Sequence, residues 1–423
     1  MATDPRRILR TLFDAALAAV SPRLVLPAHL PEPPRGRTAV LGFGKAAAEM
    51  ARVFEAHWPD PFAGFAVTRY GHAAPCRRIE VVEAGHPVPD AAAVAAADRA
   101  LALAAGLGAG DLLLCLASGG GSALLAKPAP GIALAEKQAL TRSLLACGAA
   151  IGEINCVRKH LSAIKGGRLA AAAAPAEVLT LAISDVPGDD PATIASGPTV
   201  ADPTDGAEAR AILARYGIEA GEAVEAVLSG PAGETPSSLP KARFAIVARA
   251  RDALDAAARE AGRLGIAARV LGDDLAGEAR ALGAAHAALA REAAPSGRPV
   301  VLLSGGETEV TLPRPGFGQG GRNTEYLLAL AAGLDGAPGI WAIACDTDGI
   351  DGTEDAAGAI LAPDSLARAA DSGLDARAAL AAHDSYGFFA ALGDLVVTGP
   401  TRTNVNDFRA ILIGAGADRA PPL

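Results

Sequence analysis

The sequence predicts an α/β fold of two domains, each with a mostly parallel sheet flanked by helices. Its 423 residues exceed what one ordinary core organises. Continuous apolar runs, typical of strands buried on both faces, alternate with helical patterns almost throughout. Half of the residues are hydrophobic but only 4% are aromatic, so the core depends on small aliphatic side chains that let helices pack closely on a sheet.

Each element follows from a local pattern. An amphipathic helix is expected to begin at Pro5, with Thr3 or Asp4 as its N-cap. Apolar runs predict strands at 38–43, 64–69, 79–84, 111–117, 177–184, 242–248, 267–271, 299–304, 340–345, 395–398 and 409–413. Helices are expected near 45–57, 90–106, 135–150, 155–173, 205–216, 251–264, 275–293, 323–333 and 385–392.

One connection is rich in proline, serine and glycine. The stretch 228–241, "LSGPAGETPSSLPK", predicts a domain boundary. We therefore expect an N-terminal domain over 1–235 and a C-terminal domain over 236–423.

Composition excludes several classes of protein. A net charge of −9 argues against general nucleic-acid binding. The five cysteines form no CxxC pair, which indicates neither a disulfide framework nor a zinc site. No uncharged run reaches the ~18 residues of a membrane span, and Asp14 interrupts the apolar stretch that resembles a signal peptide. We expect a cytoplasmic protein with no membrane partner.

The first predicted strand ends in "GFGKAA", a glycine turn that carries a lysine. Gly42, Gly44 and Ala47 fit the G-x-G-x-x-A pattern of dinucleotide-binding turns, which is weak evidence alone. Lys45 is one of only six lysines among 38 basic residues, and a lysine at a helix N-terminus opposes the macrodipole unless an anion is present. A flexible ammonium is well suited to a moving phosphoryl group.

A second glycine turn follows the strand at 111–117. Its sequence "SGGGS", Ser118 to Ser122, predicts an amide-lined concavity for an anion. The basic residues Arg158, Lys159, Lys165 and Arg168 then form either a solvated helix face or an anion-binding cluster.

Carboxylates follow the strand at 177–184. Asp185, Asp189 and Asp190 lie in a proline-broken loop that leads to Ser196, where the three carboxylates serve either as turn residues or as ligands for a hard cation such as Mg²⁺. In the C-terminal half, polar and charged residues again follow predicted strands. They include Glu307, Arg322, Asn323, Asp351 and Asn404.

These parts suit phosphoryl transfer, in which the protein mainly positions groups and neutralises charge. The sequence contains no G-x-S-x-G elbow and no Walker A motif.

Eight strings together resemble one family. They are "GFGKAA", "LASGGGSALL", "NCVRKHLSAIKGGRLA", "ISDVPGDDPATIASGPT", "LLSGGETEV", "GGRNTEYLLALA", "DTDGIDGTEDAAGA" and "LVVTGPTRTNVNDF", in order from Gly42 to Phe408. The set resembles the class II glycerate kinases, or glycerate 2-kinases, whose C-terminal region is the "multi-organism fragment with rich leucine" (MOFRL) domain. Thr324, where a glutamine is common, is a small departure from that pattern.

The resemblance implies two Rossmann-like domains with an active site in the cleft between them. It implies transfer of the ATP γ-phosphate to the 2-hydroxyl of D-glycerate with Mg²⁺. We expect a monomer or homodimer. Lys45 and Arg322 match the pair regarded as catalytic in this family. We assign Asp189 to metal binding or hydroxyl activation, with Asp185 as a second metal ligand. The residues expected to bind substrate or phosphate are Gly44, Ser118, Gly119, Gly120, Gly121, Ser122, Arg158, Lys159, Ser196, Glu307, Asn323, Asp351 and Asn404.

Two other functions remain open. Some family members carry the label hydroxypyruvate reductase, and the NAD(P)H hypothesis rests on the glycine turn together with Arg69, which could hold a 2′-phosphate. The second glycine turn and the carboxylates would then have no role. A non-catalytic sensor of sugar acids or nucleotides would need neither Lys45 nor the metal carboxylates.

Overall fold

The computed structural model describes residues 4–293, 298–312 and 317–414. The chain divides into two compact units: the first is Pro22–Val247, and the second combines the chain up to Ser21 with the chain from Ala248 onward. The division therefore differs in place from the expected one at 235/236. The strand at 242–248 joins the sheet of the first unit, and the N-terminal helix packs in the second.

The first unit is built on a six-stranded sheet in the order β3-β2-β1-β4-β5-β6. Its strands are β1 (Thr38–Phe43), β2 (Phe62–Arg69), β3 (Glu80–Ala84), β4 (Leu112–Ala117), β5 (Glu177–Ile183) and β6 (Ala242–Ala248). The pairs β1–β2, β2–β3, β1–β4 and β4–β5 are parallel, as predicted. Phe43 lies opposite Ala117, so the two glycine turns leave neighbouring strands at the same edge.

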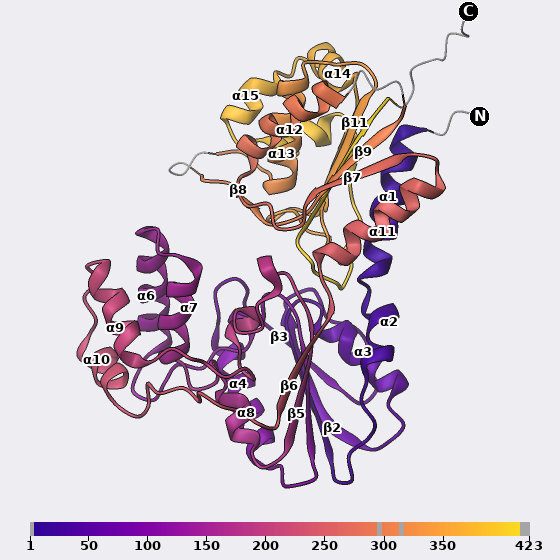
Figure 1. Ribbon diagram of the computed structural model, residues 1–423. Helices are drawn as coiled ribbons and strands as arrows, with labels where there is room; N and C mark the ends of the chain where they lie inside the picture. The colour runs from indigo at the N-terminus through magenta and orange to yellow at the C-terminus, as the bar shows by residue number, and fades with distance from the viewer. Residues whose placement is uncertain (1–3, 294–297, 313–316, 415–423) are drawn as a thin grey trace, which may run out of the picture. The chain divides into compact units, whose positions relative to one another are not determined.

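Helices cover both faces of this sheet. Figure 1 shows α4 (Ala91–Ala105) and α8 (Arg168–Ala173) on one face and α3 (Ala47–His57) on the other. Alanines of α4 are fully buried against the sheet, because only small side chains permit such close approach. The first unit also contains two short helices, α2 (Pro22–Val25) and α5 (Gly121–Leu124).

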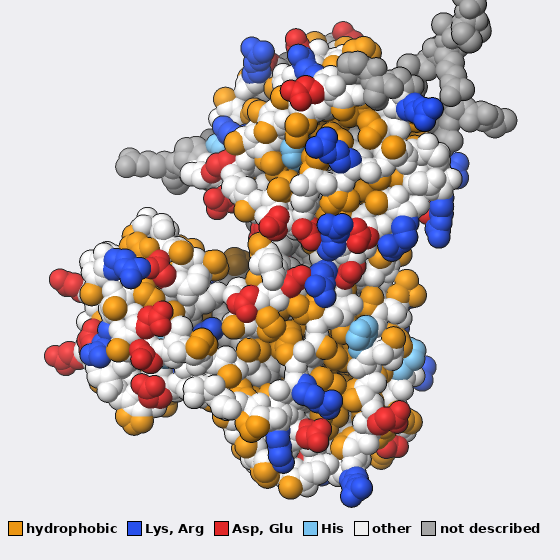
Figure 2. Space-filling view, in the orientation of Figure 1, with side chains coloured by type: hydrophobic (Ala, Val, Ile, Leu, Met, Phe, Trp, Pro, Cys, Tyr) orange, Lys and Arg blue, Asp and Glu red, His pale blue; other side chains and the backbone are white. Residues whose placement is uncertain are grey.

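A helical lobe extends from the sheet of the first unit. It comprises α6 (Leu134–Ala146), α7 (Ile151–His160), α9 (Gly206–Arg215) and α10 (Glu222–Ser229), packed on a small core of their own that includes Leu144, Val157 and Leu213. Figure 2 shows acidic and basic side chains interspersed over α9 and α10. The single helix expected over 155–173 is two helices, α7 and α8, because Gly166 (φ 56°) and Gly167 (φ 81°) have left-handed backbone.

The second unit also holds a six-stranded sheet, in the order β13-β12-β11-β14-β9-β7. Its strands are β7 (Ala267–Gly272), β9 (Val300–Ser304), β11 (Ile340–Asp346), β12 (Gly358–Leu361), β13 (Leu395–Val396) and β14 (Asp407–Ile413); β8 (Gly277–Glu278) and β10 (Thr308–Glu309) pair separately. Within the six-stranded sheet β7–β9 is parallel and the other four pairs are antiparallel, whereas the separate β8–β10 pair is parallel. The prediction of a mostly parallel second sheet was wrong, because an apolar run indicates burial on both faces and not strand direction.

Helices again flank this sheet. Figure 1 shows α12 (Ala279–Ala293) and α13 (Arg322–Leu334) on one face and α1 (Pro5–Ala19) with α11 (Ala250–Arg263) on the other. Three short helices, α14 (Ser365–Asp371), α15 (Ala376–Ala381) and α16 (Ser385–Ala391), follow β12. In the part of the chain that the structure describes, no helix is long and apolar enough to cross a bilayer.

Candidate active site

The two glycine turns of the first unit interlock. Gly44 has a φ of 128°, and a Cβ there would stand 2.2 Å from the Ser118 hydroxyl. The Lys45 amide donates to the Gly119 carbonyl at 2.8 Å, and the Ala46 amide donates to the Ser118 hydroxyl at 3.0 Å. The sequence predicted two separate anion-binding turns, and the structure places the two turns in direct contact.

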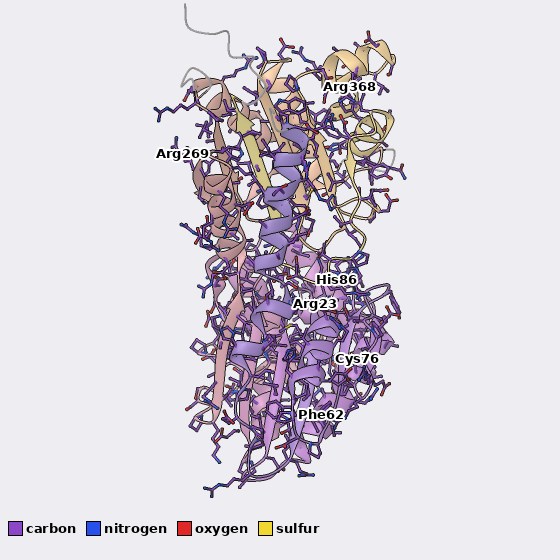
Figure 3. The ribbon with its side chains drawn as sticks, turned by 90° about the vertical axis from the view of Figure 1, so that its right-hand side faces the viewer. Arg23, Phe62, Cys76, His86, Arg269 and Arg368 are labelled. Atoms are coloured by element: carbon purple, nitrogen blue, oxygen red, sulfur yellow. The ribbon has the colours of Figure 1, made fainter. Side chains whose placement is uncertain are left out.

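Lys45 lies against the second turn. A Cβ built on Gly120 would stand 3.3 Å from the Lys45 Cγ, so the aliphatic stem of the lysine passes directly over this glycine. His86, labelled in Figure 3 on the segment after β3, also borders Gly120, because the same Cβ would stand 3.0 Å from its imidazole ring. Any larger residue at position 120 would displace one of these side chains.

Ser122 is the centre of a polar cluster. Its hydroxyl lies 2.8 Å from the Ser196 hydroxyl and accepts a hydrogen bond from the Arg158 guanidinium. Lys165 Nζ donates to the Ser122 carbonyl at 2.6 Å and to the Ser122 hydroxyl at 3.0 Å. The structure therefore brings together Ser122, Arg158 and Ser196, and Lys165 joins them. Their role in binding stays a prediction.

Lys159 points elsewhere. Its Nζ is buried and lies 3.4 Å from Asp202 Oδ1. Neighbouring residues of one helix face different directions, so Arg158 contacts Ser122 while Lys159 pairs with a carboxylate.

Asp185 lies in the segment directly after β5, and Asp189 ends the turn of 3₁₀ helix that follows (Pro187–Asp189). Both are half-buried, and Asp189 has a φ of 56°. Among the described residues no group of three His, Cys, Asp or Glu side chains could hold a metal. Mg²⁺ usually takes only one or two carboxylates, together with water and phosphate oxygens.

In the second unit, Arg322 is the first residue of α13 and is held by three carboxylates. Its Nε lies 2.8 Å from Asp407 Oδ1, its Nη2 lies 2.9 Å from Asp346 Oδ2, and its Nη1 lies 2.6 Å from Glu307 Oε1. Burial alone would lower the pKa of Arg322, but these three charges outweigh it and hold that pKa well above its ordinary value. The guanidinium is therefore both fixed and charged.

Asp351 fixes the start of α13. Its two carboxylate oxygens accept from the Asn323 and Thr324 amides, each at 2.9 Å, and satisfy the first free donors of the helix. Burial raises the pKa of Asp351, although the hydrogen bonds from Asn323 and Thr324 oppose that rise. Gly321 leaves the room for this contact, since a Cβ there would stand 2.3 Å from the Asp351 carboxyl carbon.

Asn323 and Asn404 are buried in the same unit. Asn323 Nδ2 donates to Asp407 Oδ1 at 2.8 Å, so Asp407 links the asparagine to Arg322. Asn404 Oδ1 accepts from the Asn406 amide at 3.4 Å, which shapes the turn before β14.

Sequence reasoning missed two cations. Lys137 is buried in α6, and its Nζ donates to the Arg158 carbonyl at 3.0 Å and to the Leu161 carbonyl at 2.9 Å. Arg409 is 1% exposed and binds Asp407 from the side opposite Arg322. The scarcity of lysine could have singled out Lys137, as it did Lys45. Nothing distinguishes Arg409 among so many arginines.

Comparison with known proteins gives the family of this chain. A domain of unknown function, DUF4147, matches residues 8–229, and the MOFRL family matches residues 300–407. The D-glycerate 2-kinase of Thermotoga maritima is 39% identical over 96% of this chain and 98% of its own length. The chain belongs to the class II glycerate kinase family.

Two further similarities bear on this family. The crystal structure of a Thermotoga maritima glycerate kinase superposes with a TM-score of 0.87 at 37% identity, covering 96% of this chain and 99% of that one. A protein from Agrobacterium vitis, whose name provisionally gives it a hydroxypyruvate reductase activity, is 57% identical over 97% of this chain and 94% of its own length. Both names occur within one family, and the site chemistry has to distinguish them.

Proposed function

We propose that this protein is a kinase that transfers the γ-phosphate of ATP to the 2-hydroxyl of D-glycerate, giving 2-phosphoglycerate. The observation that carries the proposal is the interlocked pair of glycine turns with Lys45 lying over Gly120. A lysine held on such a turn supplies one flexible ammonium for a group with several negative oxygens. Relatives named as glycerate 2-kinases, which align over nearly the whole chain, support the same reaction.

The site residues of the first unit have separate proposed roles. Lys45 stabilises the phosphoryl group during transfer, because a flexible ammonium can follow it from donor to acceptor. The segment from Ser118 to Ser122, with Gly44 and Ser196, binds phosphate or substrate through amides and hydroxyls. Asp189, with Asp185, would hold Mg²⁺, which when bound neutralises phosphate charge, or would receive the proton of the 2-hydroxyl.

The second unit supplies Arg322, which we assign to clamping the substrate or the charge that develops on it. Asp351 and Asn323 hold the N-terminus of α13, so they determine where the guanidinium lies. Glu307 and Asn404 complete the set of proposed binding residues. We place the reaction in the cytoplasm, where ATP is available and the five free cysteines stay reduced.

A direct assay tests this proposal. The purified chain is incubated with D-glycerate, ATP and Mg²⁺ and coupled to enolase, which accepts 2-phosphoglycerate but not the 3-phosphate. Phosphoenolpyruvate should form without added phosphoglycerate mutase. Formation only after the mutase is added would assign the 3-phosphate, and no ATP consumption would reject the kinase.

The reductase remains the second candidate because of the name of the Agrobacterium vitis relative and the glycine turn after β1. Arg69, the last residue of β2, is the candidate contact for a 2′-phosphate. Oxidation of NADPH or NADH with hydroxypyruvate, measured on the same preparation, would support it. We expect no such turnover, because a reductase would leave the second glycine turn and the carboxylates of the β5 loop without a function.

A further inference from the structure

A cavity of about 240 Å³ lies within the first unit, beside Ser122. Its walls come from the segment after β3, the segment after α5, and helices α6 and α7. Pockets for drug-sized ligands measure roughly 300–1,000 Å³, so this one is suited to a small metabolite and too small for a whole nucleotide.

Four cations line this cavity, of which Arg142 is exposed and the other three are buried or partly buried. Lys165 is 1% exposed and Lys137 is 8% exposed, and both line the cavity together with Arg158. Within residues 4–293, 298–312 and 317–414, no carboxylate lies within ion-pair distance of any of the three. Buried cations without an anionic partner are costly, and folded proteins seldom retain them without compensation.

The pKa shifts agree with this arrangement. Burial lowers the pKa of Lys165 well below its ordinary value, and repulsion from Arg158 and Lys137 lowers it further. Burial likewise lowers the pKa of Arg158. A bound anion would relieve both effects.

The rest of the cavity wall is mostly apolar. Leu134 and Pro128 line it, and the strongly exposed side chains of Val88 and Leu145 lie at its rim. A ligand that fits both ends has one anionic group and a short carbon chain. Inorganic phosphate would leave the apolar wall empty.

The cavity also lies close to the proposed phosphoryl site. Lys45 passes over Gly120, and the Cα atoms of Gly120 and Ser122 are at most ~7.6 Å apart across two peptide bonds.

We propose that Arg158 and Lys165, fixed on Ser122, bind the carboxylate of a short hydroxy acid, and that this contact makes the enzyme select acids over neutral polyols. The proposal rests on the proposed function for the identity of the acid. The carboxylate contact itself can be tested without turnover.

The test is Lys165→Met, with Lys241→Met as the matched control, since Lys241 is an exposed lysine of the same unit. In the enolase-coupled assay, Lys165→Met should raise the KM for D-glycerate about 10- to 100-fold, the effect of losing a hydrogen bond to a charged group. The KM for ATP should stay unchanged, and the control should behave like the wild type. A rise in the KM for ATP alone, or no change in either KM, would overturn the proposal.

Calorimetric titration without ATP separates this proposal from the proposed function. The wild type should bind D-glycerate and not glycerol, and Lys165→Met should lose that binding even if no phosphorylation were ever detected. Equal binding of glycerol, or D-glycerate binding that survives in Lys165→Met, would contradict the assignment. If Lys165→Met lacks a wild-type circular dichroism spectrum, Arg158→Gln replaces it in both measurements, with the same outcomes expected.

Discussion

The Ser122 cluster of the first unit and the Arg322 cluster of the second unit contain the same kinds of groups in opposite proportion. Around Ser122, three cations meet hydroxyl and carbonyl oxygens and no carboxylate among the described residues. Around Arg322, one guanidinium meets three carboxylates. Among the described residues, the first arrangement lacks a carboxylate counter-ion and the second has three. Whether a basic residue marks a ligand site therefore depends on whether a carboxylate of the protein already pairs with it.

The carboxylates around Arg322 are not equivalent. The Asp407 side chain is fully buried and that of Asp346 is nearly so, while the Glu307 side chain is 51% exposed. An exposed ion pair contributes only about 0–1 kcal/mol, so Glu307 is the partner that an incoming anion displaces most easily. We infer that Asp407 and Asp346 orient Arg322. The guanidinium then becomes available to an anion on the side that Glu307 occupies.

The largest effect is expected for Lys45→Ala. Removing a group that stabilises transition-state charge costs about 10²–10³ in kcat, because no other cation in the turn can follow the phosphoryl group. The enolase-coupled assay measures kcat, and circular dichroism checks that the fold is unchanged.

Lys241→Ala is the control for Lys45→Ala. It removes an exposed lysine of the same unit and should leave kcat unaltered. If Lys45→Ala turned over like the wild type, Lys45 would have no role in the transfer.

Charge removal should have different consequences for stability at the two clusters. Arg322→Met leaves buried carboxylates without their partner and should destabilise the second unit by about 3–5 kcal/mol. Lys165→Met removes a buried cation that has no anionic partner among the described residues, so it should not destabilise the first unit. Hydrogen exchange at the amides of α13 and α7 reports the two units separately.

Equal destabilisation by Arg322→Met and Lys165→Met would mean that the clusters do not differ as their contacts indicate. Arg322→Lys sharpens the comparison. It retains the charge but cannot reach three carboxylates at once, so its stability should lie between those of the wild type and Arg322→Met.

A smaller effect is expected for Asp189→Asn. If Asp189 holds Mg²⁺, losing one carboxylate charge should raise the Mg²⁺ concentration for half-maximal activity about tenfold, within the range for weakened metal sites. Asp190→Asn is the control, because Asp190 occupies the same loop but caps the following turn through the Ala192 amide and the Thr193 hydroxyl. Identical Mg²⁺ titrations for Asp189→Asn and the wild type would remove Asp189 from the metal site.

The sequence predicted the first unit better than the second, for a physical reason. Parallel strands joined by helices produce a regular alternation, and β1 and β6 have the predicted bounds. The antiparallel strand β12 and the short helices α14 and α15 were missed, because four to seven residues carry too little periodicity. The helix predicted over 155–173 is interrupted at Gly166 and Gly167, although the composition of this stretch favours one continuous helix.

The candidate site was partly predictable. Lys45 was singled out because lysine is scarce in this sequence, and the glycine turns were recognisable from the spacing of their glycines. Both signals can be read without knowing the fold. The partners of Arg322 come from three separate segments, and the cap that Asp351 gives α13 is a tertiary contact. An aspartate after a strand has the same local pattern whether it binds a ligand or caps a helix, so only the fold distinguishes the two roles.

The smallest expected effect concerns pH. Lys165 and Lys137 have pKa values lowered well below 10.5 by burial. Between those lowered values and 10.5 the unfolded chain binds more protons than the folded one, so these lysines make stability rise with pH in that window. At lower pH both lysines are charged in the folded state, and their full burial penalty applies.

The thermal midpoint of Lys165→Met, compared with that of the wild type across this window, isolates the contribution of one lysine. The thermal midpoint of the wild type should rise relative to that of the variant as pH rises. Saturating D-glycerate should reduce this rise, because a bound carboxylate stabilises the ammonium. A difference between the two midpoints that is independent of pH and of D-glycerate would mean that Lys165 is already compensated within the fold, and the contrast with Arg322 would disappear.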